Sequence, residues 1–411
     1  MPNKTTDSTR SPIKSPRLGQ KAVSLNPVLH RQRKNPELKS SKSIAIVANS
    51  TWNIYNFRQN VIRKCIEEGF KVYVLAPIDA YIEYKENFPE VTHINLSTLD
   101  RDSTNPIKDL LLVEELRRKY RKIKPDLVVH YTHKPNIFGT LAARLAGVKS
   151  VSVITGLGYS FINRGFINVV TEWLYRRTAR YSSSMIFENE DDRDLFIQKR
   201  LVKEDRAFAV KGCGVNTVYY QSKKDHSPDP PVFTFIGRLL KDKGILEFAS
   251  AARHFHEKAW PATFVVLGDF DPENPSTIDR DTLLEWISED TVDYKGFVND
   301  VRPFLEKSTC IVLPSYREGM PRIVLEAMAM GKPVITTRTA GCRETVEEGV
   351  NGFLAVARSV EDLIVAMEKF CELSPDQRSA MGARGRSMAV DVFSDTIIAE
   401  DLFRIFCLSL V

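Results

Sequence analysis

The sequence predicts an α/β protein built from two doubly wound, Rossmann-like domains that face one another across a cleft. Short, continuously apolar segments alternate with amphipathic helical segments, which is typical of parallel strands covered by helices on both faces. The alternation runs through one series and begins a second series near residue 207. The length of 411 residues exceeds one ordinary core and fits two or three domains.

The overall composition is that of a folded protein, with 43% hydrophobic, 27% charged and 9% aromatic residues. It excludes a chain that is disordered throughout, a collagen-like fibre and a small disulfide scaffold. No apolar run approaches the roughly 20 residues of a membrane-spanning helix, and the polar N-terminus lacks a secretory signal, so we expect a cytoplasmic protein. The scattered cysteines form no C-x-x-C pair, which favours reduced, buried thiols and disfavours a zinc site.

Residues 1–42 form a basic segment, with ten Lys or Arg residues against two acidic ones. The segment has no usable hydrophobic period, so we expect a disordered tail. A polybasic tail that contacts anionic lipid is favoured over an organelle transit peptide, because no amphipathic helix is encoded there. Residues 43–206 carry a net charge of +5 and residues 207–411 a net charge of −7. The first half is therefore expected to meet an anionic partner, such as a nucleic acid, a phospholipid surface or a phosphorylated lipid.

Residues 43–206 are expected to form the first domain. Its strands are expected at 43–48, 71–76, 126–130 and 150–154, and its helices at 56–68, 107–123 and 137–146. Gly69 and Gly147 each follow a helical segment, where a left-handed residue commonly ends the helix.

Residues 207–392 are expected to form the second domain. Its strands are expected at 232–236, 262–267, 292–296, 310–313 and 333–336, and its helices at 244–258, 280–288, 299–307, 321–330 and 360–373. The last segment, 393–411, is an amphipathic helix with no strand after it, and we expect it to pack back on the first domain. Ligands of doubly wound sheets bind at the carboxyl ends of the strands, so the function is expected in the cleft where those ends meet.

The segment 314–331 contains the most informative pattern for chemistry. A strand is expected to end just before it, Pro321 suits the first residue of a helix, and Gly319 lets a ligand approach the backbone closely. A helix N-terminus placed in this way binds anions and suits a diphosphate. Glu318 and Glu326 would be about 12 Å apart along a helix, too far for the ~5 Å carboxylate pair of a retaining glycosidase. We expect them to hold hydroxyls at two ends of one elongated ligand.

The segment 237–244 supplies two cations after a predicted strand. Gly237 ends that strand, and Arg238 and Lys243 then extend from the loop into the cleft. A guanidinium and an ammonium group suit two neighbouring phosphates. The alternative interpretation is a solvated basic loop.

These two segments together resemble the family 4 glycosyltransferases, retaining enzymes with the GT-B fold. The resemblance covers nearly all of residues 43–411 and is strongest at Gly-Arg-x4-Lys and Glu-x7-Glu. It implies that Arg238 and Lys243 bind the diphosphate of a nucleotide-sugar donor. It also implies that Glu326 holds the ribose hydroxyls and that Glu318 is a catalytic residue that orients the transferred sugar.

The resemblance implies further donor contacts through the main chain. The amides of Gly319 and Met320 would orient the sugar together with the preceding carboxylate, and the main chain at Phe297 and Val298 would recognise the nucleotide base. The second domain would thus bind the nucleotide sugar and the first domain the acceptor. Asn216 stands where the family usually has Asp in Gly-Val-Asp, and this departure puts a role for that position in doubt.

Within the family, the first domain is similar to bacterial transferases that extend a sugar on polyprenyl diphosphate, N-acetylgalactosaminyltransferases among them. The segments that carry this similarity are 50–58, 132–139, 155–158 and 268–275. The similarity implies a UDP-sugar donor carrying HexNAc or hexose and a lipid-linked or cell-surface glycan acceptor, as in capsule or lipopolysaccharide synthesis. It also implies peripheral contact with the inner face of the plasma membrane and no nucleic-acid partner.

Two histidines are candidates for a place beside the reacting carbon. His133 follows the strand expected at 126–130 and matches the family histidine that touches the donor sugar, whereas His130 at the strand end suits a satisfied core residue. His133 is favoured. In the retaining mechanism inferred for the family, attack and departure share one face of the sugar, so the resemblance implies no covalent intermediate, no cofactor and no metal. No Asp-x-Asp cluster is present in the cleft loops to hold one.

Acceptor contacts are expected from two loops of the first domain. Asn53, Asn56 and Arg58 open its first helix, and Thr155 and Gly156 follow a strand end. Their donors are placed to meet a lipid diphosphate. Separately, residues 159–180 mix aromatic and aliphatic residues with arginines, which fits a helix lying in a membrane interface and equally fits a core helix with solvated arginines.

Two rival functions remain open from the sequence. A non-hydrolysing UDP-sugar 2-epimerase has the same two-domain shape, but the chain shows no close match to its residues. A catalytically silent scaffold that binds sugar nucleotides or glycans is the other rival. The four residues Arg238, Lys243, Glu318 and Glu326 argue against it, because a scaffold does not need all four.

Overall fold

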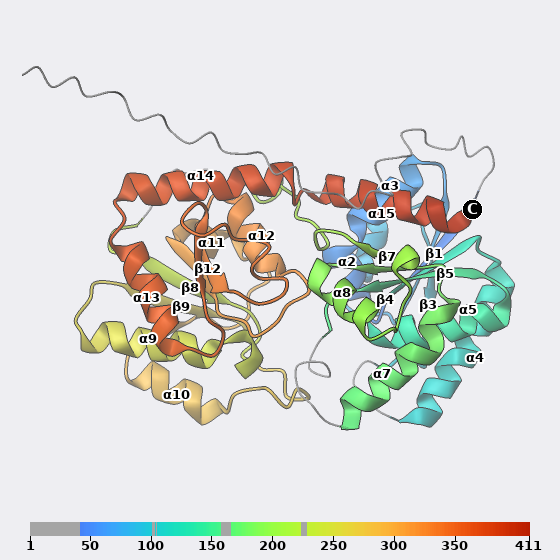
Figure 1. The fold of residues 1–411 in the computed structure, drawn as a ribbon, viewed down its shortest axis with the longest axis horizontal. Helices are drawn as coiled ribbons and strands as arrows, with labels where there is room; N and C mark the ends of the chain where they lie inside the picture. Colours follow the sequence, from blue (N-terminus) through green and yellow to red (C-terminus); the bar gives the residue numbers. More distant parts are fainter. Residues whose placement is uncertain (1–41, 101–102, 104, 158–165, 223–227) are drawn as a thin grey trace, which may run out of the picture. The chain divides into compact units, whose positions relative to one another are not determined.

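The computed structural model describes residues 42–411 except 101–102, 104, 158–165 and 223–227, and it contains two parallel β-sheets with helices on both faces of each (Figure 1). The tail predicted over 1–42 therefore lies outside the described residues except for Lys42. Part of the aromatic segment predicted over 159–180 also lies outside them.

The first sheet has seven strands in the order β3-β2-β1-β4-β5-β6-β7. They are β1 (Ser43–Val47), β2 (Lys71–Ala76), β3 (Thr92–Asn95), β4 (Leu127–Tyr131), β5 (Lys149–Ile154), β6 (Ser184–Phe187) and β7 (Ala207–Ala209). All neighbouring pairs are parallel, so their carboxyl ends lie along one edge. The sequence predicted four of these strands; β3, β6 and β7 are only three or four residues long and carry little periodic signal.

The helices around the first sheet are α2 (Thr51–Phe57), α3 (Gln59–Glu67), α4 (Pro106–Ile123), α5 (Thr140–Ala146), α7 (Phe166–Thr178) and α8 (Glu190–Gln198). Shorter 3₁₀ turns are η1 (Ile82–Asn87), η3 (Ala179–Tyr181) and η4 (Glu204–Arg206), and the π-helical turn η2 (Pro135–Gly139) leads into α5. The prediction of a single helix over 56–68 is wrong at its N-terminal end, because the structure has the two helices α2 and α3 in this region. Ser50 caps a separate helix by accepting a hydrogen bond from the Asn53 amide, and Arg58 interrupts the helical path with φ −123°.

The second sheet has six parallel strands in the order β10-β9-β8-β11-β12-β13. They are β8 (Val232–Ile236), β9 (Thr263–Leu267), β10 (Asp293–Tyr294), β11 (Cys310–Leu313), β12 (Val334–Thr337) and β13 (Gly352–Ala355). Around them lie η5 (Lys241–Lys243), α9 (Ile245–Glu257), α10 (Arg280–Ser288), α11 (Arg302–Lys307), α12 (Arg322–Ala329) and α13 (Val360–Cys371). The sequence missed β13, and α12 begins one residue after Pro321.

Two segments that follow residue 206, β7 and the C-terminal helix, lie with the first sheet. β7 pairs with β6 in the first sheet, although it begins just after the predicted end of the first domain at residue 206. The chain ends in α14 (Pro375–Asp391) and α15 (Asp395–Leu410). α15 packs on the first sheet, where Ser409 bonds Ser184 at 2.9 Å between hydroxyls and Lys64 pairs with Glu400 at 2.6 Å.

None of the helices in the described part of the chain combines the length and the apolar character needed to cross a membrane.

Candidate active site

The loop between β11 and α12 contains Glu318, whose carboxylate is paired with a cation from another strand end. Glu318 Oε1 accepts a hydrogen bond from Lys243 Nζ at 2.5 Å and another from Ser315 Oγ at 2.7 Å. The side chain of Glu318 is 12% exposed and that of Lys243 is 24% exposed. Both side chains are therefore partly exposed, so a charged ligand can reach them.

Glycines bring this loop against neighbouring backbone. A Cβ on Gly319 would lie 2.6 Å from the Thr155 carbonyl oxygen, and one on Gly156 would lie 3.0 Å from the Gly319 amide nitrogen. A Cβ on Gly341 would lie 2.5 Å from the carbonyl oxygens of residues 318 and 319. Only glycine permits these approaches, so the predicted acceptor loop at Thr155 and Gly156 directly touches the predicted donor loop.

Lys243 and Arg238 follow β8, as the sequence predicted, but their partners differ. Gly244 ends the turn η5 with φ +76°, and a Cβ there would lie 2.2 Å from the Pro314 carbonyl oxygen, so this turn lies against the Glu318 loop. The structure thus brings Lys243 to Glu318. The Arg238 guanidinium is paired with Asp271 instead, and its side chain is 46% exposed.

Gly319 and Met320 lie just before α12. Within the described residues, neither of their amides donates a hydrogen bond. The Met320 side chain is buried in the core of the second sheet, so this residue can offer a ligand its amide only. The predicted anion site at the start of this helix therefore keeps two available N–H donors.

Glu326 lies one turn into α12 and is 8% exposed. Its Oε1 accepts a hydrogen bond from Arg322 Nε at 2.8 Å. Burial raises the pKa of the Glu326 carboxyl, while the nearby Arg322 guanidinium opposes that shift. Arg322 also donates to the Asn56 carbonyl oxygen, which ties the helix to the first sheet's loops.

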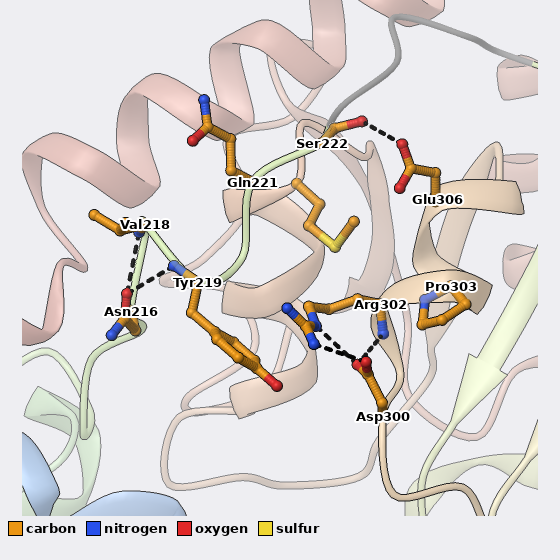
Figure 2. Close-up of a pocket in the computed structure, with 10 residues that line it drawn as sticks. Asn216, Val218, Tyr219, Gln221, Ser222, Asp300, Arg302, Pro303 and Glu306 are labelled. Atoms are coloured by element: carbon orange, nitrogen blue, oxygen red, sulfur yellow. Dashed lines mark hydrogen bonds and ion pairs between the residues drawn. The ribbon is translucent and has the colours of Figure 1, made fainter. Parts of the chain in front are cut away.

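A pocket of about 1060 Å³ is lined by Asn216, Tyr219 and Arg302, among other residues (Figure 2). Within it the Arg302 guanidinium lies 3.8 Å from the ring centre of Tyr219 and makes a two-point ion pair with Asp300. Asn216 Oδ1 accepts from the amides of residues 218 and 219, so Asn216 has a turn-stabilising role that an acidic side chain could also fill. Phe297, 61% exposed, and the half-buried Val298 lie in the loop that leads to this pocket.

His133 lies directly after β4, where the backbone turns through Thr132 at φ +73°. Its Nδ1 bonds the Tyr175 hydroxyl at 3.1 Å, and burial lowers the pKa of the imidazole. The ring is therefore neutral near pH 7. His130, in contrast, is fully buried, bonds Tyr120 at 2.9 Å, and has its pKa lowered by burial to about 3. The structure thus places His130 in the core and His133 at the strand-end edge.

Two of the predicted acceptor residues, Asn53 and Arg58, bond one another, whereas Asn56 Nδ2 donates to the Trp52 carbonyl oxygen at 3.0 Å. Asn53 is buried, and its Oδ1 accepts from Arg58 Nε at 3.3 Å. Arg58 is 3% exposed; it lies 3.7 Å from Glu188 Oε1 and 4.0 Å from the Tyr131 ring centre. The guanidinium is therefore a buried partner of Glu188 in this structure. Direct acceptor contact by Arg58 stays a prediction.

Glu188, Asn189 and Asp192 form a group that the sequence reasoning missed. Burial raises the pKa of the Glu188 carboxyl to about 7, although the Arg58 guanidinium opposes the shift. Asn189 Nδ2 donates to the Gly319 carbonyl oxygen at 2.7 Å. These residues directly follow β6, so recognising that four-residue strand would have marked them as strand-end residues. In the described part of the chain, no three His, Cys, Asp or Glu side chains come together as a group able to hold a metal ion.

Comparison with known proteins adds two family matches. A model described as "Glycosyl transferase 4-like" matches residues 43–189, and one described as "Glycosyl transferases group 1" matches residues 230–372.

Curated relatives and solved structures agree with these matches. The chain is 28% identical over 381 residues to the N,N'-diacetylbacillosaminyl-diphospho-undecaprenol alpha-1,3-N-acetylgalactosaminyltransferase of Campylobacter jejuni, covering 88% of this chain and 98% of that protein. It is 29% identical over 274 residues to the UDP-Gal:alpha-D-GlcNAc-diphosphoundecaprenol alpha-1,3-galactosyltransferase of Escherichia coli, covering 64% and 70%. The structure of Anabaena HepE in complex with UDP superimposes with a TM-score of 0.69 at 19% identity, covering 89% of this chain and 99% of that one.

Proposed function

The chain belongs to the family 4 glycosyltransferases of the GT-B fold, and we propose that it moves one sugar, with retention of configuration, from a UDP-sugar to a polyprenyl-diphosphate-linked or cell-surface glycan. The observation that carries the proposal is the Lys243–Glu318 pair on a loop touched by Thr155 and Gly156. The Lys243 ammonium would bind the leaving diphosphate, and the Glu318 carboxylate would bind the sugar. Both groups lie next to the loop that we propose for acceptor binding. The transferred sugar is HexNAc or hexose, as in the relatives named above.

The donor diphosphate would lie against Lys243 and Arg238, and the amides of Gly319 and Met320 would orient the transferred sugar. Binding would exchange the Lys243–Glu318 ion pair for a Lys243–phosphate pair, which leaves the Glu318 carboxylate free to accept hydrogen bonds from sugar hydroxyls. As the sugar–phosphate bond breaks, negative charge grows on the diphosphate. The two cations and the dipole of α12 stabilise that charge as it grows, which lowers the barrier to departure.

The incoming acceptor hydroxyl would attack from the face that the diphosphate leaves. Its proton passes to the departing phosphate oxygen, so the step needs no separate strong base and no metal or other cofactor. His133, kept neutral by burial, would accept or donate one hydrogen bond to the sugar. This role agrees with its position at the end of β4.

The nucleoside would lie next to Glu326, which we assign to the ribose hydroxyls. Loop residues Phe297 and Val298 would contact the base through their main chain, and the pocket beside Tyr219 offers space at that end. A carboxylate that accepts from two hydroxyls contributes charge-assisted hydrogen bonds of about 1.5–3 kcal/mol.

A Glu326→Gln variant is expected to bind UDP about tenfold more weakly, because it loses the charge that accepts from the ribose. Calorimetry with UDP and with 2′,3′-dideoxy-UDP tests the assignment. The unmodified protein should prefer UDP, and the variant should bind both compounds with closely similar Kd. An undiminished preference for UDP in the variant would place the ribose elsewhere.

Peripheral membrane contact is proposed for the edge of the first sheet that carries His133. Helices α4 and α7 follow β3 and β5, so their first turns lie at the carboxyl edge of this sheet. Both helices contact the turn after β4. Asp109 of α4 forms a 3.0 Å ion pair with Lys134, and Tyr175 of α7 is hydrogen-bonded to His133. Their exposed apolar residues are Ile107, Leu110, Leu111, Val169, Val170 and Trp173. This surface suits an interfacial position next to a lipid-linked acceptor.

A double variant, Leu110→Glu with Trp173→Glu, is expected to lower partitioning onto anionic liposomes at least about tenfold, because each lost apolar contact contributes ~1 kcal/mol and each new charge is repelled. Turnover on a short-chain, soluble acceptor should stay unchanged. Leu284→Glu on α10, also an exposed leucine, is the matched control. Equal liposome binding by the double variant and the control would disprove this docking surface.

A transfer screen by mass spectrometry tests the function itself. Purified protein is incubated with UDP-, GDP- and ADP-sugars and a polyprenyl-diphosphate monosaccharide in detergent. A gain of one sugar mass on the lipid supports the proposal and identifies the donor. Conversion of a UDP-sugar without a lipid product would favour an epimerase, and UDP binding without any conversion would favour a silent scaffold.

A further inference from the structure

Asn189 connects the first sheet to the backbone of the proposed catalytic loop. It precedes α8, follows β6 by two residues and is 1% exposed. Its Nδ2 donates to the Gly319 carbonyl oxygen at 2.7 Å and lies 3.4 Å from the Glu318 carbonyl oxygen. The same side chain caps its own helix, since Oδ1 accepts from the Asp192 amide at 2.8 Å.

Asp192 extends this contact to the other end of the loop. It is fully buried, and its Oδ2 accepts from Asn189 Nδ2 at 3.2 Å. Its Oδ1 accepts from the guanidinium of Arg317, the residue before Glu318. The first turn of α8 therefore holds the loop on both sides of the catalytic carboxylate, while Glu318 N donates to the Ala340 carbonyl oxygen at 3.1 Å.

The direction of the two amides follows from peptide geometry. In a trans peptide the C=O and the following N–H point in opposite directions. The carbonyls of Glu318 and Gly319 point toward Asn189, so the N–H groups of Gly319 and Met320 point away from α8. These are the two amides that have no hydrogen-bond acceptor within the described residues. The donor on the Gly319 carbonyl also polarises that peptide and strengthens the Met320 N–H as a donor.

We propose that Asn189 is a positioning residue for sugar transfer: it orients the Gly319 and Met320 amides and the Glu318 carboxylate toward the donor. The proposal rests on the proposed function, because it assumes that this loop acts on the transferred sugar. Within the part of the chain that the structure describes, the hydrogen bonds of the Asn189 side chain go to Asp192, Glu318 and Gly319 and to none of Arg238, Lys243 or Glu326. Its loss should therefore weaken the chemical step far more than it weakens UDP binding.

The test compares Asn189→Ser with Asn105→Ser. Serine is a good N-cap, so Asn189→Ser keeps the cap of α8 and removes the amide donor. Asn105 caps α4 by accepting a hydrogen bond from the Ile107 amide. Asn105→Ser is therefore the same substitution at an N-cap that does not hold the proposed catalytic loop. Initial rates, UDP calorimetry and thermal melting are measured on the full chain, with the lipid acceptor in detergent.

We expect Asn189→Ser to lower kcat about 10- to 100-fold, less than the loss of one transition-state donor, because the two amides remain but are less well aligned, with UDP Kd within about twofold. Asn105→Ser should leave kcat, Kd and Tm unchanged. A kcat for Asn189→Ser within about twofold of the unmodified protein would overturn the proposal. So would a parallel loss of kcat, UDP affinity and Tm, since that pattern indicates a merely structural residue.

A second measurement tests the positioning role of Asn189 independently of the proposed glycosyltransferase activity. Hydrogen exchange of the peptide spanning 315–322 is followed in the absence of substrate. We expect faster exchange there in Asn189→Ser than in Asn105→Ser, because the loop loses its anchor. Unchanged exchange overturns the positioning role. If the unmodified protein transfers no sugar, the proposed function fails, while the exchange result still decides whether Asn189 orders the loop.

Discussion

A Glu318→Gln variant is expected to lose at least about 100-fold in kcat while its Kd for UDP stays within about threefold. Glutamine keeps the shape of the side chain and removes the charge. The lost charge matters most in the transition state, when the sugar becomes electron-poor and its hydroxyls become stronger donors. UDP alone carries no sugar, and Lys243 stays available for its phosphates, so nucleotide affinity is spared.

Initial rates with the lipid acceptor and calorimetry with UDP measure the two quantities separately. The matched control is Glu285→Gln on the surface of α10, where the carboxylate pairs with Arg253. The control should match the unmodified protein in both assays. A Glu318→Gln variant that keeps kcat within about threefold would remove Glu318 from the proposed mechanism.

A Lys243→Ala variant is expected to raise the Kd for UDP about 10- to 100-fold and to lower kcat as well. Two physical effects add. The variant lacks an ammonium that balances the diphosphate, and the Glu318 carboxylate keeps only the Ser315 hydroxyl of its two side-chain partners. A carboxylate without its cation repels the incoming phosphates.

The double variant Lys243→Ala with Glu318→Gln separates these effects. If repulsion by Glu318 contributes, UDP affinity should partly recover in the double variant, which a double-mutant cycle measures as a coupling free energy. Lys241→Ala, in the same short turn and exposed, is the matched control and should bind UDP normally. An unchanged UDP Kd in Lys243→Ala would disprove the phosphate assignment.

The local elements around the Glu318 loop were predicted correctly from the sequence. The pattern from 310 to 331 predicted a strand, a glycine loop and a helix, and the structure has β11, the Glu318 loop and α12 there. These features depend on local patterns: an apolar run, a glycine, and a proline before a helix. The same local signals separated a core histidine, His130, from His133 at the strand end.

The surroundings of Arg58 were not predicted from the sequence. The sequence places it near the start of a helix after a strand, which suggested a cation facing the acceptor. In the structure it is buried against Tyr131, the last residue of β4, and Glu188, the residue after β6. Only the arrangement of those strand ends decides whether the guanidinium meets a ligand or an internal carboxylate.

The sequence by itself determined the two parallel sheets and the chemical types at the site, because strand burial and helix starts are encoded over a few neighbouring residues. Tertiary structure alone decided the partners. Lys243 and Glu318 are 75 positions apart, and Asn189 and Gly319 are 130 apart, so no local period links either pair. Their contacts depend on how loops from different strands pack, and packing is set by the whole fold rather than by any one segment.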